Sequence, residues 1–359
     1  MKKILIVLDS LNLGGAERQA INLAAELIKV GYHLQVIGLG VSGNAVPLLE
    51  ELKIDFRNLD LELYTHHPTI LKRNRKSLRG FLKKQSVDVI IPFTYWPNLY
   101  CNWTYKKAKV TKCFWNQRDL NLNLGNFDKE QEILQSATTV IGNSKACLES
   151  LEAFFDVNID NKLVIRNGIS SKFLIPRIKT AETKDAIMVA NIQKNKDHQT
   201  LFEAWKIVKE KLGSECPELH LAGAKRDTFE SLELLVERLD IKDKVKFLGM
   251  VDDIPELLKK YRFSVFSSNA EGSPNGVLEC MANGLPIVAT KISSIEEATG
   301  SAYDFLVPIK SPQIFTDKII ALLSDPGSMD QIGLQNQERI KSDYSVDQMV
   351  ESYIKLIEE

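Results

Sequence analysis

Apolar residues along the chain occur in two alternating patterns. Residues 2–8 contain a short continuous apolar run, residues 16–30 place apolar side chains at helical spacing, and residues 34–39 form a second continuous run. Runs that are apolar throughout, instead of alternating with polar residues, are typical of parallel strands that are covered on both faces. The N-terminal segment therefore predicts a β-α-β unit.

The same alternation continues to residue 290 in two series. Between them, residues 176–185 are polar and lack apolar periodicity, which is typical of a linker. Residues 345–358 again show helical spacing, so this last helix is expected to pack on another part of the protein. The pattern predicts an α/β protein with two doubly wound parallel-sheet domains that face a central cleft. Further strands are predicted at residues 87–93, 112–116, 138–144 and 162–168 in the first series, and at 186–191, 219–224, 245–250, 263–268 and 286–290 in the second.

Residues 266–290 hold the strongest candidate for a ligand site. A strand, a turn rich in Gly, Ser, Pro and Asn, and a helix that begins near Gly276 follow one another in this segment. Gly272 and Gly276 permit the backbone to approach a ligand closely, and the first free N–H groups of the helix carry a positive partial charge. A diphosphate is the natural occupant of such a helix start.

Two carboxylates flank this turn. Glu271 precedes the turn and Glu279 lies on the helix, so the pair is expected to reach opposite ends of one elongated ligand. Carboxylates suit vicinal hydroxyl groups, because each charge-assisted hydrogen bond contributes roughly 1.5–3 kcal/mol. Two glutamates alone are better explained as a turn residue and a solvated helix position.

The whole segment resembles the donor site of retaining glycosyltransferases of the GT-B fold, family 4 (group 1), in which two glutamates are separated by seven residues. Glu271 and Glu279 keep that spacing. The resemblance implies that Glu279 holds the ribose hydroxyls, that Glu271 meets the donor sugar, and that the amides of residues 275–277 bind the diphosphate. The donor-binding positions that it implies in this part of the chain are Gly249, in a loop near the nucleotide base, and Glu271, Gly272, Ser273, Pro274, Asn275, Gly276, Val277 and Glu279.

Other stretches match the same family, so the resemblance spans nearly the whole chain. Gly14 and Gly15, in the string LNLGGAER, resemble its N-terminal glycine loop, which also contacts the donor. In VANIQKNKDHQTLFEAW, Lys196 occupies the position of a lysine that clamps the diphosphate, whereas Asn191 stands where an arginine is expected. An asparagine offers no bidentate guanidinium, so Lys194 is a candidate to compensate.

The acceptor is expected to bind near the string CFWNQRDLN, because this string follows a predicted strand and so opens on the cleft. Asn116, Gln117, Arg118 and Asp119 are its candidate ligands. A buried tryptophan and a loop ion pair explain the same string equally well.

The resemblance also implies domain limits. Residues 1–170 correspond to an acceptor-side N-terminal domain, residues 171–184 to a linker, and residues 185–343 to the donor domain. Residues 344–359 correspond to the family's terminal helix, which crosses back onto the first domain.

The remaining composition indicates neither a metal nor a cofactor. The five cysteines are scattered, odd in number and never spaced C-x-x-C, which fits reduced thiols in a cytosol better than disulfides or zinc. No D-x-D triplet occurs, so a metal-bridged diphosphate is not expected. The expected partners are a UDP- or GDP-linked sugar and a glycan acceptor, without nucleic acid.

Residues 71–84 form a basic segment without acidic residues. They account for most of the charge difference between residues 1–170, with 22 Lys and Arg against 17 Asp and Glu, and the rest of the chain, with 24 against 30. Each cation near an anionic lipid surface adds on the order of 1 kcal/mol, so the segment predicts peripheral contact with the inner face of the cytoplasmic membrane. A solvated helix face explains it equally well, and no run reaches the roughly 20 apolar residues that span a bilayer, so a cytoplasmic location is expected. The cations are Lys72, Arg73, Arg75, Lys76, Arg79, Lys83 and Lys84, and the apolar side chains expected to contact lipid are Ile70, Leu71, Leu78, Phe81 and Leu82.

These features predict a retaining, metal-independent transferase that moves a sugar from a nucleotide-diphosphate sugar to a lipid-linked glycan in lipopolysaccharide or capsule synthesis. The resemblance implies same-face substitution, with Lys196, Gly15 and Glu271 as the catalytic candidates. An epimerase or phosphorylase on the same scaffold stays open because fold does not determine chemistry. Asn191 leaves open a catalytically weak nucleotide-sugar-binding subunit, whereas a nicotinamide oxidoreductase is disfavoured because the Gly14–Gly15 loop lacks the G-x-G-x-x-G spacing.

Overall fold

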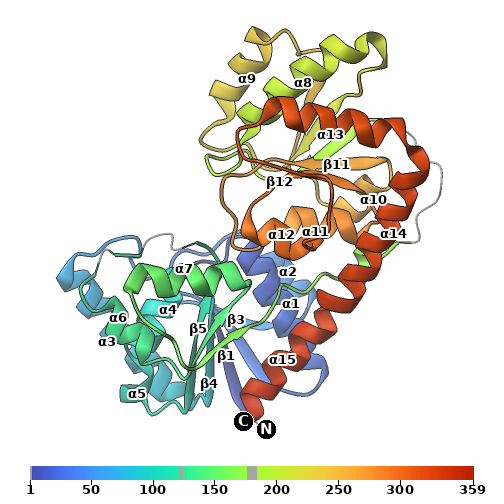
Figure 1. Ribbon diagram of the computed structural model, residues 1–359. Helices are drawn as coiled ribbons and strands as arrows, with labels where there is room; N and C mark the ends of the chain where they lie inside the picture. The colour runs from blue at the N-terminus through green and yellow to red at the C-terminus, as the bar shows by residue number, and fades with distance from the viewer. Residues whose placement is uncertain (1, 121–123, 126, 176–183) are drawn as a thin grey trace. The chain divides into compact units, whose positions relative to one another are not determined.

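The chain forms two compact units in a computed structural model that describes residues 2–120, 124–125, 127–175 and 184–359 (Figure 1). Unit 1 contains Met1–Gly168 and Val346–Glu359, and unit 2 contains Ile169–Ser345. Most of the predicted linker, residues 176–183, lies outside the described residues.

Unit 1 is built on a seven-stranded, wholly parallel sheet of order β3-β2-β1-β4-β5-β6-β7. The central strand β1 pairs with β2 on one side, where Ile4 is opposite Leu34, and with β4 on the other, where Ile4 is opposite Val89. The strands are β1 (Lys3–Leu8), β2 (His33–Gly38), β3 (Asp55–Asn58), β4 (Val89–Pro92), β5 (Lys112–Gln117), β6 (Thr139–Gly142) and β7 (Lys162–Val164). The helices are α1 (Gly15–Lys29), α2 (Val46–Glu51), α3 (Pro68–Gln85), α4 (Tyr95–Asn102), α5 (Tyr105–Ala108), α6 (Glu130–Gln135), α7 (Lys145–Phe155) and α15 (Val346–Glu358).

Unit 2 is built on a six-stranded parallel sheet of order β10-β9-β8-β11-β12-β13, with helices on both faces (Figure 1). Its strands are β8 (Ala186–Val189), β9 (Leu219–Ala222), β10 (Val245–Gly249), β11 (Phe263–Phe266), β12 (Ile287–Thr290) and β13 (Leu306–Val307). Its helices are α8 (His198–Leu212), α9 (Phe229–Arg238), α10 (Ile254–Leu258), α11 (Asn275–Ala282), α12 (Ser293–Thr299), α13 (Pro312–Ser324) and α14 (Pro326–Asp343), with short 3-10 turns at Ser171–Phe173 and Gly213–Glu215.

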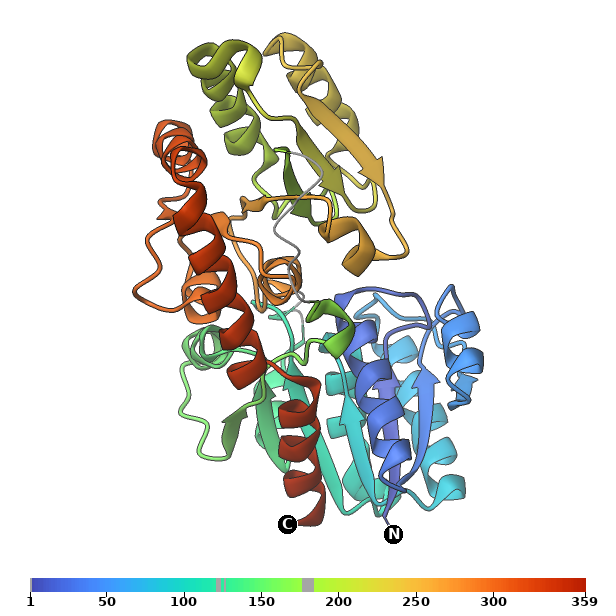
Figure 2. The ribbon, with the colours of Figure 1, turned by 90° about the vertical axis from the view of Figure 1, so that its right-hand side faces the viewer.

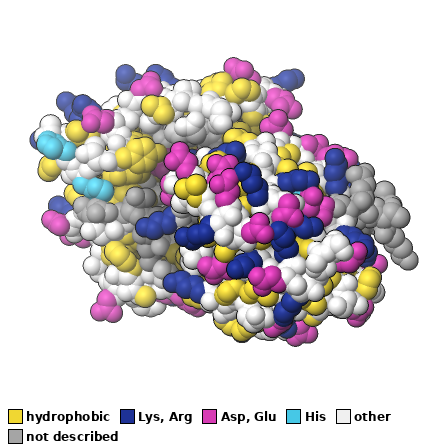
Figure 3. All heavy atoms as spheres, turned by 90° about the horizontal axis from the view of Figure 1, so that it is seen from above, with side chains coloured by type: hydrophobic (Ala, Val, Ile, Leu, Met, Phe, Trp, Pro, Cys, Tyr) yellow, Lys and Arg dark blue, Asp and Glu magenta, His cyan; other side chains and the backbone are white. Residues whose placement is uncertain are grey.

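Successive apolar residues of strand β1 in unit 1 enter different cores. In β1, Leu5 and Val7 pack into one buried cluster, and Ile4 and Ile6 pack into another. Both faces of the sheet are therefore covered, which is why the strands read as continuous apolar runs. On the face that Figure 3 shows, acidic and basic side chains are mixed.

The last helix, α15, belongs to unit 1. It packs against α1 (Figure 2), and Met349, Val350 and Tyr353 of this helix are buried in the unit 1 core. Asn116 donates from Nδ2 to the Tyr353 hydroxyl at 2.8 Å, which ties α15 to the end of β5. The predicted α/β fold with two doubly wound parallel sheets and a C-terminal helix that returns to the first domain is confirmed.

The order of the strands marks where ligands are expected. In unit 1 the order reverses between β1 and β4, and in unit 2 it reverses between β8 and β11. Open parallel sheets bind ligands beyond the carboxyl ends of their strands at such a reversal. The loops that follow β1, β4, β8 and β11 are therefore the natural places to look for a site.

Candidate functional site

The centre of the candidate site in unit 2 is an ion pair between Lys196 and Glu271. Lys196 follows β8 and Glu271 follows β11, and their side chains are only 10% and 9% exposed. The Glu271 Oε1 atom that accepts from the Lys196 ammonium also accepts from the Ser268 hydroxyl at 2.6 Å. Two residues that are 75 positions apart in sequence thus meet at the strand-order reversal of unit 2.

The loop that carries Lys196 is held to the loop after β11 by its own backbone. The Asp197 N–H donates to the Ser267 carbonyl at 3.1 Å, and the Asn269 N–H donates to the Asn195 carbonyl at 2.9 Å. Asp197 then caps α8 by accepting from the Thr200 N–H at 3.3 Å. These contacts fix the backbone at Lys196, and the bond to Glu271 fixes its ammonium.

His198 packs next to this loop as a buried side chain. Its ring is buried, and Nδ1 donates to the Lys196 carbonyl at 3.2 Å. Burial lowers the pKa of His198 to about 4, so the imidazole is uncharged at neutral pH. It therefore adds no charge to the site.

The N-terminus of α11 is next to this pair in sequence and in space. No side chain caps the helix, whose N-cap position is held by Pro274. The Asn275 N–H donates to the Ser273 carbonyl at 3.0 Å, so the amides that follow it in the first turn are the candidates to bind an anion. Glu279 lies on the same helix and is partly buried. Of the other predicted donor positions in this segment, Gly272, Pro274 and Val277 are buried and Ser273 and Asn275 are partly buried.

The structure gives a different reason for a glycine at position 276 than the one expected from the sequence. A Cβ atom at this position would collide with the Val189 carbonyl oxygen of β8. The absent side chain thus lets α11 pack closely on β8, and does not serve only the approach of a ligand. Gly249 has a positive φ of 71° with open space beside it, so its backbone conformation, not crowding, favours glycine there.

Asn191 joins the loop after β8 to the loop after β9. Its Oδ1 accepts from the Ala224 N–H at 3.0 Å, so the side chain stands as a structural link where the family resemblance leads one to expect an arginine.

In unit 1, Gly14 is the N-cap of α1 and Gly15 is its first residue. The Glu17 carboxylate lies over this helix start and accepts from the Gly14 backbone. Burial is the main cause that raises the pKa of Glu17. A carboxylate at the glycine loop opposes the approach of a phosphate to Gly14 and Gly15, which favours uncharged, hydroxyl-bearing groups at this end of the sheet.

Three of the four predicted acceptor ligands are buried in unit 1. Asn116 binds Tyr353 and Asn98, and Gln117 accepts from the Trp115 indole at 3.0 Å. Arg118 is 8% exposed and donates to the side-chain oxygens of Asn116 and Asn167. Burial lowers the pKa of Arg118.

Asn116 therefore ties β5 to α15, and Arg118 ties the end of β5 to the segment after β7, whereas the Gln117 side chain bonds to Trp115 and Asp119 of its own segment. Of the four residues, Asp119 is the one that is partly exposed. The interpretation as a buried structural string describes the contacts of Asn116, Gln117 and Arg118 better than the interpretation as open acceptor ligands.

Sequence reasoning missed a second group of polar residues in unit 1. Asp9 follows β1, and Thr94 follows β4 with a positive φ of 72°. Burial raises the pKa of Asp9 to about 7, with smaller contributions from Glu17 and Asp119. The available signal was an aspartate directly after a buried strand at a position where open sheets bind ligands.

An aromatic group accompanies these acids. The ring centroids of His66 and Trp96 are 4.8 Å apart, and those of Tyr64 and Trp96 are 6.2 Å apart. Tyr64 is 69% exposed, and its pKa is raised first by burial and then by Asp9 and Glu17, which places the phenol near both carboxyls. Acids beside an exposed aromatic ring are suited to a sugar.

A G-x-G-x-x-G string that the sequence interpretation overlooked occurs at Gly38–Gly43. A Cβ atom at Gly38 would crowd Leu11 and one at Gly43 would crowd Asn12, so these glycines let the loop after β2 pack on the loop after β1. The string follows β2 and leads into the six-residue helix α2, whereas the dinucleotide fingerprint follows the first strand of its unit and opens a long helix.

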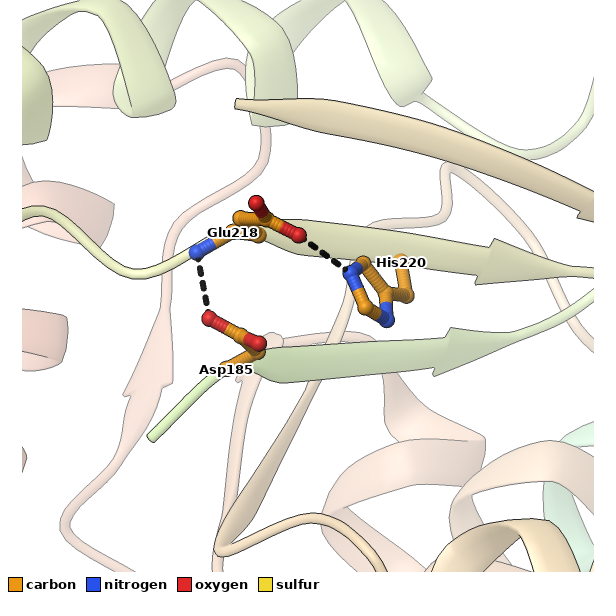
Figure 4. A group of neighbouring side chains, drawn as sticks. All are labelled: Asp185, Glu218 and His220. Atoms are coloured by element: carbon orange, nitrogen blue, oxygen red, sulfur yellow. Dashed lines mark hydrogen bonds and ion pairs between the residues drawn. The ribbon is translucent and has the colours of Figure 1, made fainter. Parts of the chain in front are cut away.

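One group of His, Asp and Glu in the described residues has ligand atoms close enough to hold a metal ion: Asp185, Glu218 and His220 (Figure 4). His220 Nε2 lies 2.9 Å from Glu218, Asp185 accepts from the Glu218 N–H at 2.8 Å, and Lys246 pairs with Glu218. Because Asp185 and Glu218 precede β8 and β9, the group lies at the opposite end of these strands from Lys196. Its members are joined by hydrogen bonds and by the Lys246–Glu218 ion pair, and the group is not part of the candidate site.

Comparisons with known proteins agree with this geometry. Residues 173–339 match the profile of glycosyl transferases group 1, and residues 13–173 match that of glycosyltransferase family 4. An uncharacterized glycosyltransferase of Haemophilus influenzae is 26% identical over 302 residues, with 82% of each chain covered. The N,N'-diacetylbacillosaminyl-diphospho-undecaprenol alpha-1,3-N-acetylgalactosaminyltransferase of Campylobacter jejuni is 26% identical over 291 residues, with 72% of this chain and 74% of that protein covered.

Solved structures share the fold at low sequence identity. Anabaena Alr3699/HepE, crystallised in complex with UDP and glucose, superposes with a TM-score of 0.87 at 18% identity over 100% of both chains. TarM of S. aureus superposes with a TM-score of 0.79 at 13% identity, also over 100% of both chains. Since the two profiles together account for residues 13–339 and the fold agrees with them, the chain belongs to the group 1 glycosyltransferases of family 4.

Proposed function

We propose that this glycosyltransferase takes a sugar from a UDP- or GDP-linked donor and transfers it, with retention of configuration and without a metal, to a lipid-linked glycan in surface polysaccharide synthesis. The observation that carries the proposal is the buried Lys196–Glu271 pair beside the uncapped start of α11. It places a cation, an acceptor of hydroxyl hydrogen bonds and the start of a helix that no side chain caps at one strand-order reversal.

The donor is assigned to these groups by their chemistry. The amides at residues 275–277 and the Lys196 ammonium suit the diphosphate, Glu271 suits the hydroxyls of the sugar, and Glu279 suits the ribose. The related fold of Alr3699/HepE binds UDP and glucose, which supports a nucleotide sugar as donor.

The reaction is a same-face substitution at the anomeric carbon. The bond from this carbon to the diphosphate oxygen breaks, and its electron pair stays on the diphosphate. The acceptor oxygen forms its bond from the same face, and its proton passes to the departing diphosphate oxygen. Lys196 and the helix amides stabilise the charge that develops, and preorganised donors of this kind contribute several kcal/mol.

The acceptor is assigned to the carboxyl ends of β1 and β4 in unit 1. Asp9, Glu17 and the exposed Tyr64 offer hydrogen-bond acceptors and an aromatic ring there. The Campylobacter jejuni relative is named for a lipid-linked acceptor, and another relative is an O-antigen chain mannosyltransferase of Escherichia coli, 22% identical over 224 residues. Both names support a growing lipid-linked glycan.

Membrane contact is assigned to a basic surface, the α3–α5 surface, made by exposed cations of two helices that pack together. Arg75 of α3 stacks on Trp103, next to α5, at 4.3 Å. Leu71, Leu78 and Leu82, which were expected to contact lipid, are buried in the core, so the attraction to lipid is electrostatic. No helix among the described residues has both the length and the apolar composition needed to cross a bilayer. The exposed lysines of the surface are Lys72, Lys76, Lys83, Lys84, Lys106, Lys107 and Lys109.

A second candidate function, a nucleotide-sugar-binding subunit without transfer, is favoured by one observation. Asn191 replaces a guanidinium with an amide whose oxygen is already bound to the Ala224 N–H. Without a guanidinium at position 191, the site would still bind the donor but would stabilise the leaving diphosphate weakly. Family membership favours transfer over the epimerase and phosphorylase alternatives.

The decisive experiment incubates the pure protein with a panel of UDP- and GDP-sugars, with and without EDTA, and a polyprenyl-diphosphate-linked saccharide. We expect transfer that EDTA does not reduce and a product with the anomeric configuration of the donor by NMR. An inverted product refutes retention, binding without transfer supports the subunit, and an isomerised donor supports the epimerase.

A further inference from the structure

The candidate donor site has less positive charge than a diphosphate requires. Lys196 supplies one cation, but its ammonium is paired with Glu271, and both side chains are about nine-tenths buried. The pair therefore contributes no net charge. During transfer, negative charge develops on the departing diphosphate oxygen before the acceptor proton reaches it, so the site needs a further cation close to the pair.

The loop after β9 is fastened to the loop that carries Lys196. Ala224 donates its N–H to Asn191 Oδ1 at 3.0 Å and accepts from the Ile192 N–H at 2.9 Å. The Arg226 N–H donates to the Ile192 carbonyl at 3.1 Å, and Ile192 forms an isolated parallel bridge with Lys225. These bonds form one junction of two loops at the carboxyl ends of β8 and β9.

Three cationic residues lie on this junction, and they differ in whether their side chains already have a partner. The Lys225 ammonium lies 4.0 Å from the centre of the ring of Phe229, the first residue of α9. Lys194 and Arg226 are exposed, and within the parts of the chain that the structure describes neither side chain has a hydrogen-bond or ion-pair partner. Of these two, only Arg226 offers the planar fork of donors that matches a phosphate bidentately.

We infer that Arg226 is a binding residue for the diphosphate, supplied by the β9 loop in place of the arginine that position 191 lacks. Asn191 keeps a role in this arrangement, because its amide oxygen fastens the loop that carries Arg226. The inference rests on the proposed function, since it needs a nucleoside diphosphate at Lys196 and α11. It assigns the compensating role to Arg226 in place of Lys194.

The test compares two ligands that differ by one phosphate. Calorimetry on wild type and on Arg226→Ala, Arg226→Lys, Lys194→Ala and Arg238→Ala measures Kd for UDP and UMP, or for GDP and GMP if the guanine nucleotides bind. Arg238 is an exposed arginine at the end of α9 in the same unit, so its variant makes the same charge change away from the junction. Thermal unfolding of each variant checks that the fold is intact.

We expect Arg226→Ala to weaken diphosphate binding about ten-fold or more, with less than two-fold change for the monophosphate, because one charge-assisted bidentate contact is lost. Arg226→Lys is expected to recover part of the affinity, and Arg238→Ala none of the loss. Equal losses for both nucleotides, no loss, or a loss with Lys194→Ala in place of Arg226→Ala would overturn the inference. If wild type binds no nucleoside diphosphate, the proposed function itself fails, whereas wild-type binding with an unaffected Arg226→Ala variant removes only the role of Arg226.

Discussion

The Lys196 ammonium donates to the Glu271 carboxylate across two loops of one domain, and both side chains are withdrawn from water. A buried carboxylate that loses its cation is left uncompensated, and this costs more than an exposed pair would contribute. The same two groups are therefore expected to affect both the stability and the chemistry of the protein.

Lys196→Ala is expected to lower the free energy of unfolding by about 1–3 kcal/mol and kcat by at least about a hundred-fold. Urea denaturation and transfer assays measure the two effects. The double variant with Glu271→Gln should recover part of the stability but none of the activity. Additive stability losses in this cycle would show that the two side chains do not interact.

Glu279→Gln is expected to weaken binding of the nucleoside diphosphate about ten-fold, because a neutral amide replaces the carboxylate assigned to the ribose hydroxyls. Calorimetry measures the change, and the 2′,3′-dideoxy nucleotide should bind the variant and wild type alike. Glu233→Gln, on an exposed position of α9, is the matched control. Unchanged affinity for the normal nucleotide would remove the ribose role.

Asp9 should make stability depend on pH. The pKa of Asp9 is about 7 in the folded protein, whereas its ordinary value, taken for the unfolded chain, is 3.8. Between these two pH values Asp9 is ionised in the unfolded chain and still protonated in the folded protein. The contribution of Asp9 to the free energy of unfolding therefore falls as pH rises from about 4 to about 7, and is constant above that range.

Asp9→Asn is expected to match wild type near pH 4 and to exceed its unfolding free energy by about 1–3 kcal/mol at pH 8. Denaturation at several pH values measures this difference. The exposed Asp128→Asn variant of the same unit should show no such trend. A pH-independent difference for Asp9→Asn would contradict its raised pKa.

The α3–α5 surface should hold the protein on anionic vesicles. Replacing Lys72, Lys76, Lys106 and Lys107 with Gln is expected to reduce co-sedimentation with phosphatidylglycerol vesicles by ten-fold or more, at about 1 kcal/mol for each cation. Four lysines of unit 2, Lys206, Lys242, Lys259 and Lys341, provide a control of equal charge. Equal losses for the two quadruple variants would indicate non-specific attraction in place of a defined surface.

Local sequence patterns determined most of the fold. Residues 4–8 are apolar without interruption because β1 is covered on both faces, and this pattern predicts a parallel strand wherever the chain places it. The helix start at residues 275–277 and the spacing of Glu271 and Glu279 are also local, so the segment that forms the donor half of the site could be recognised from the sequence.

The sequence did not show which polar side chains are accessible to a ligand and which are buried. Asn116 and Arg118 read as polar residues at the end of a strand, yet their partners Tyr353 and Asn167 come from distant segments, and both side chains are buried. Asp9 and Tyr64 lie near each other because the sheet brings β3, which precedes Tyr64, to within two strands of β1, which precedes Asp9. Burial and pairing depend on which distant segments pack together, and a single sequence records only the order of residues along the chain.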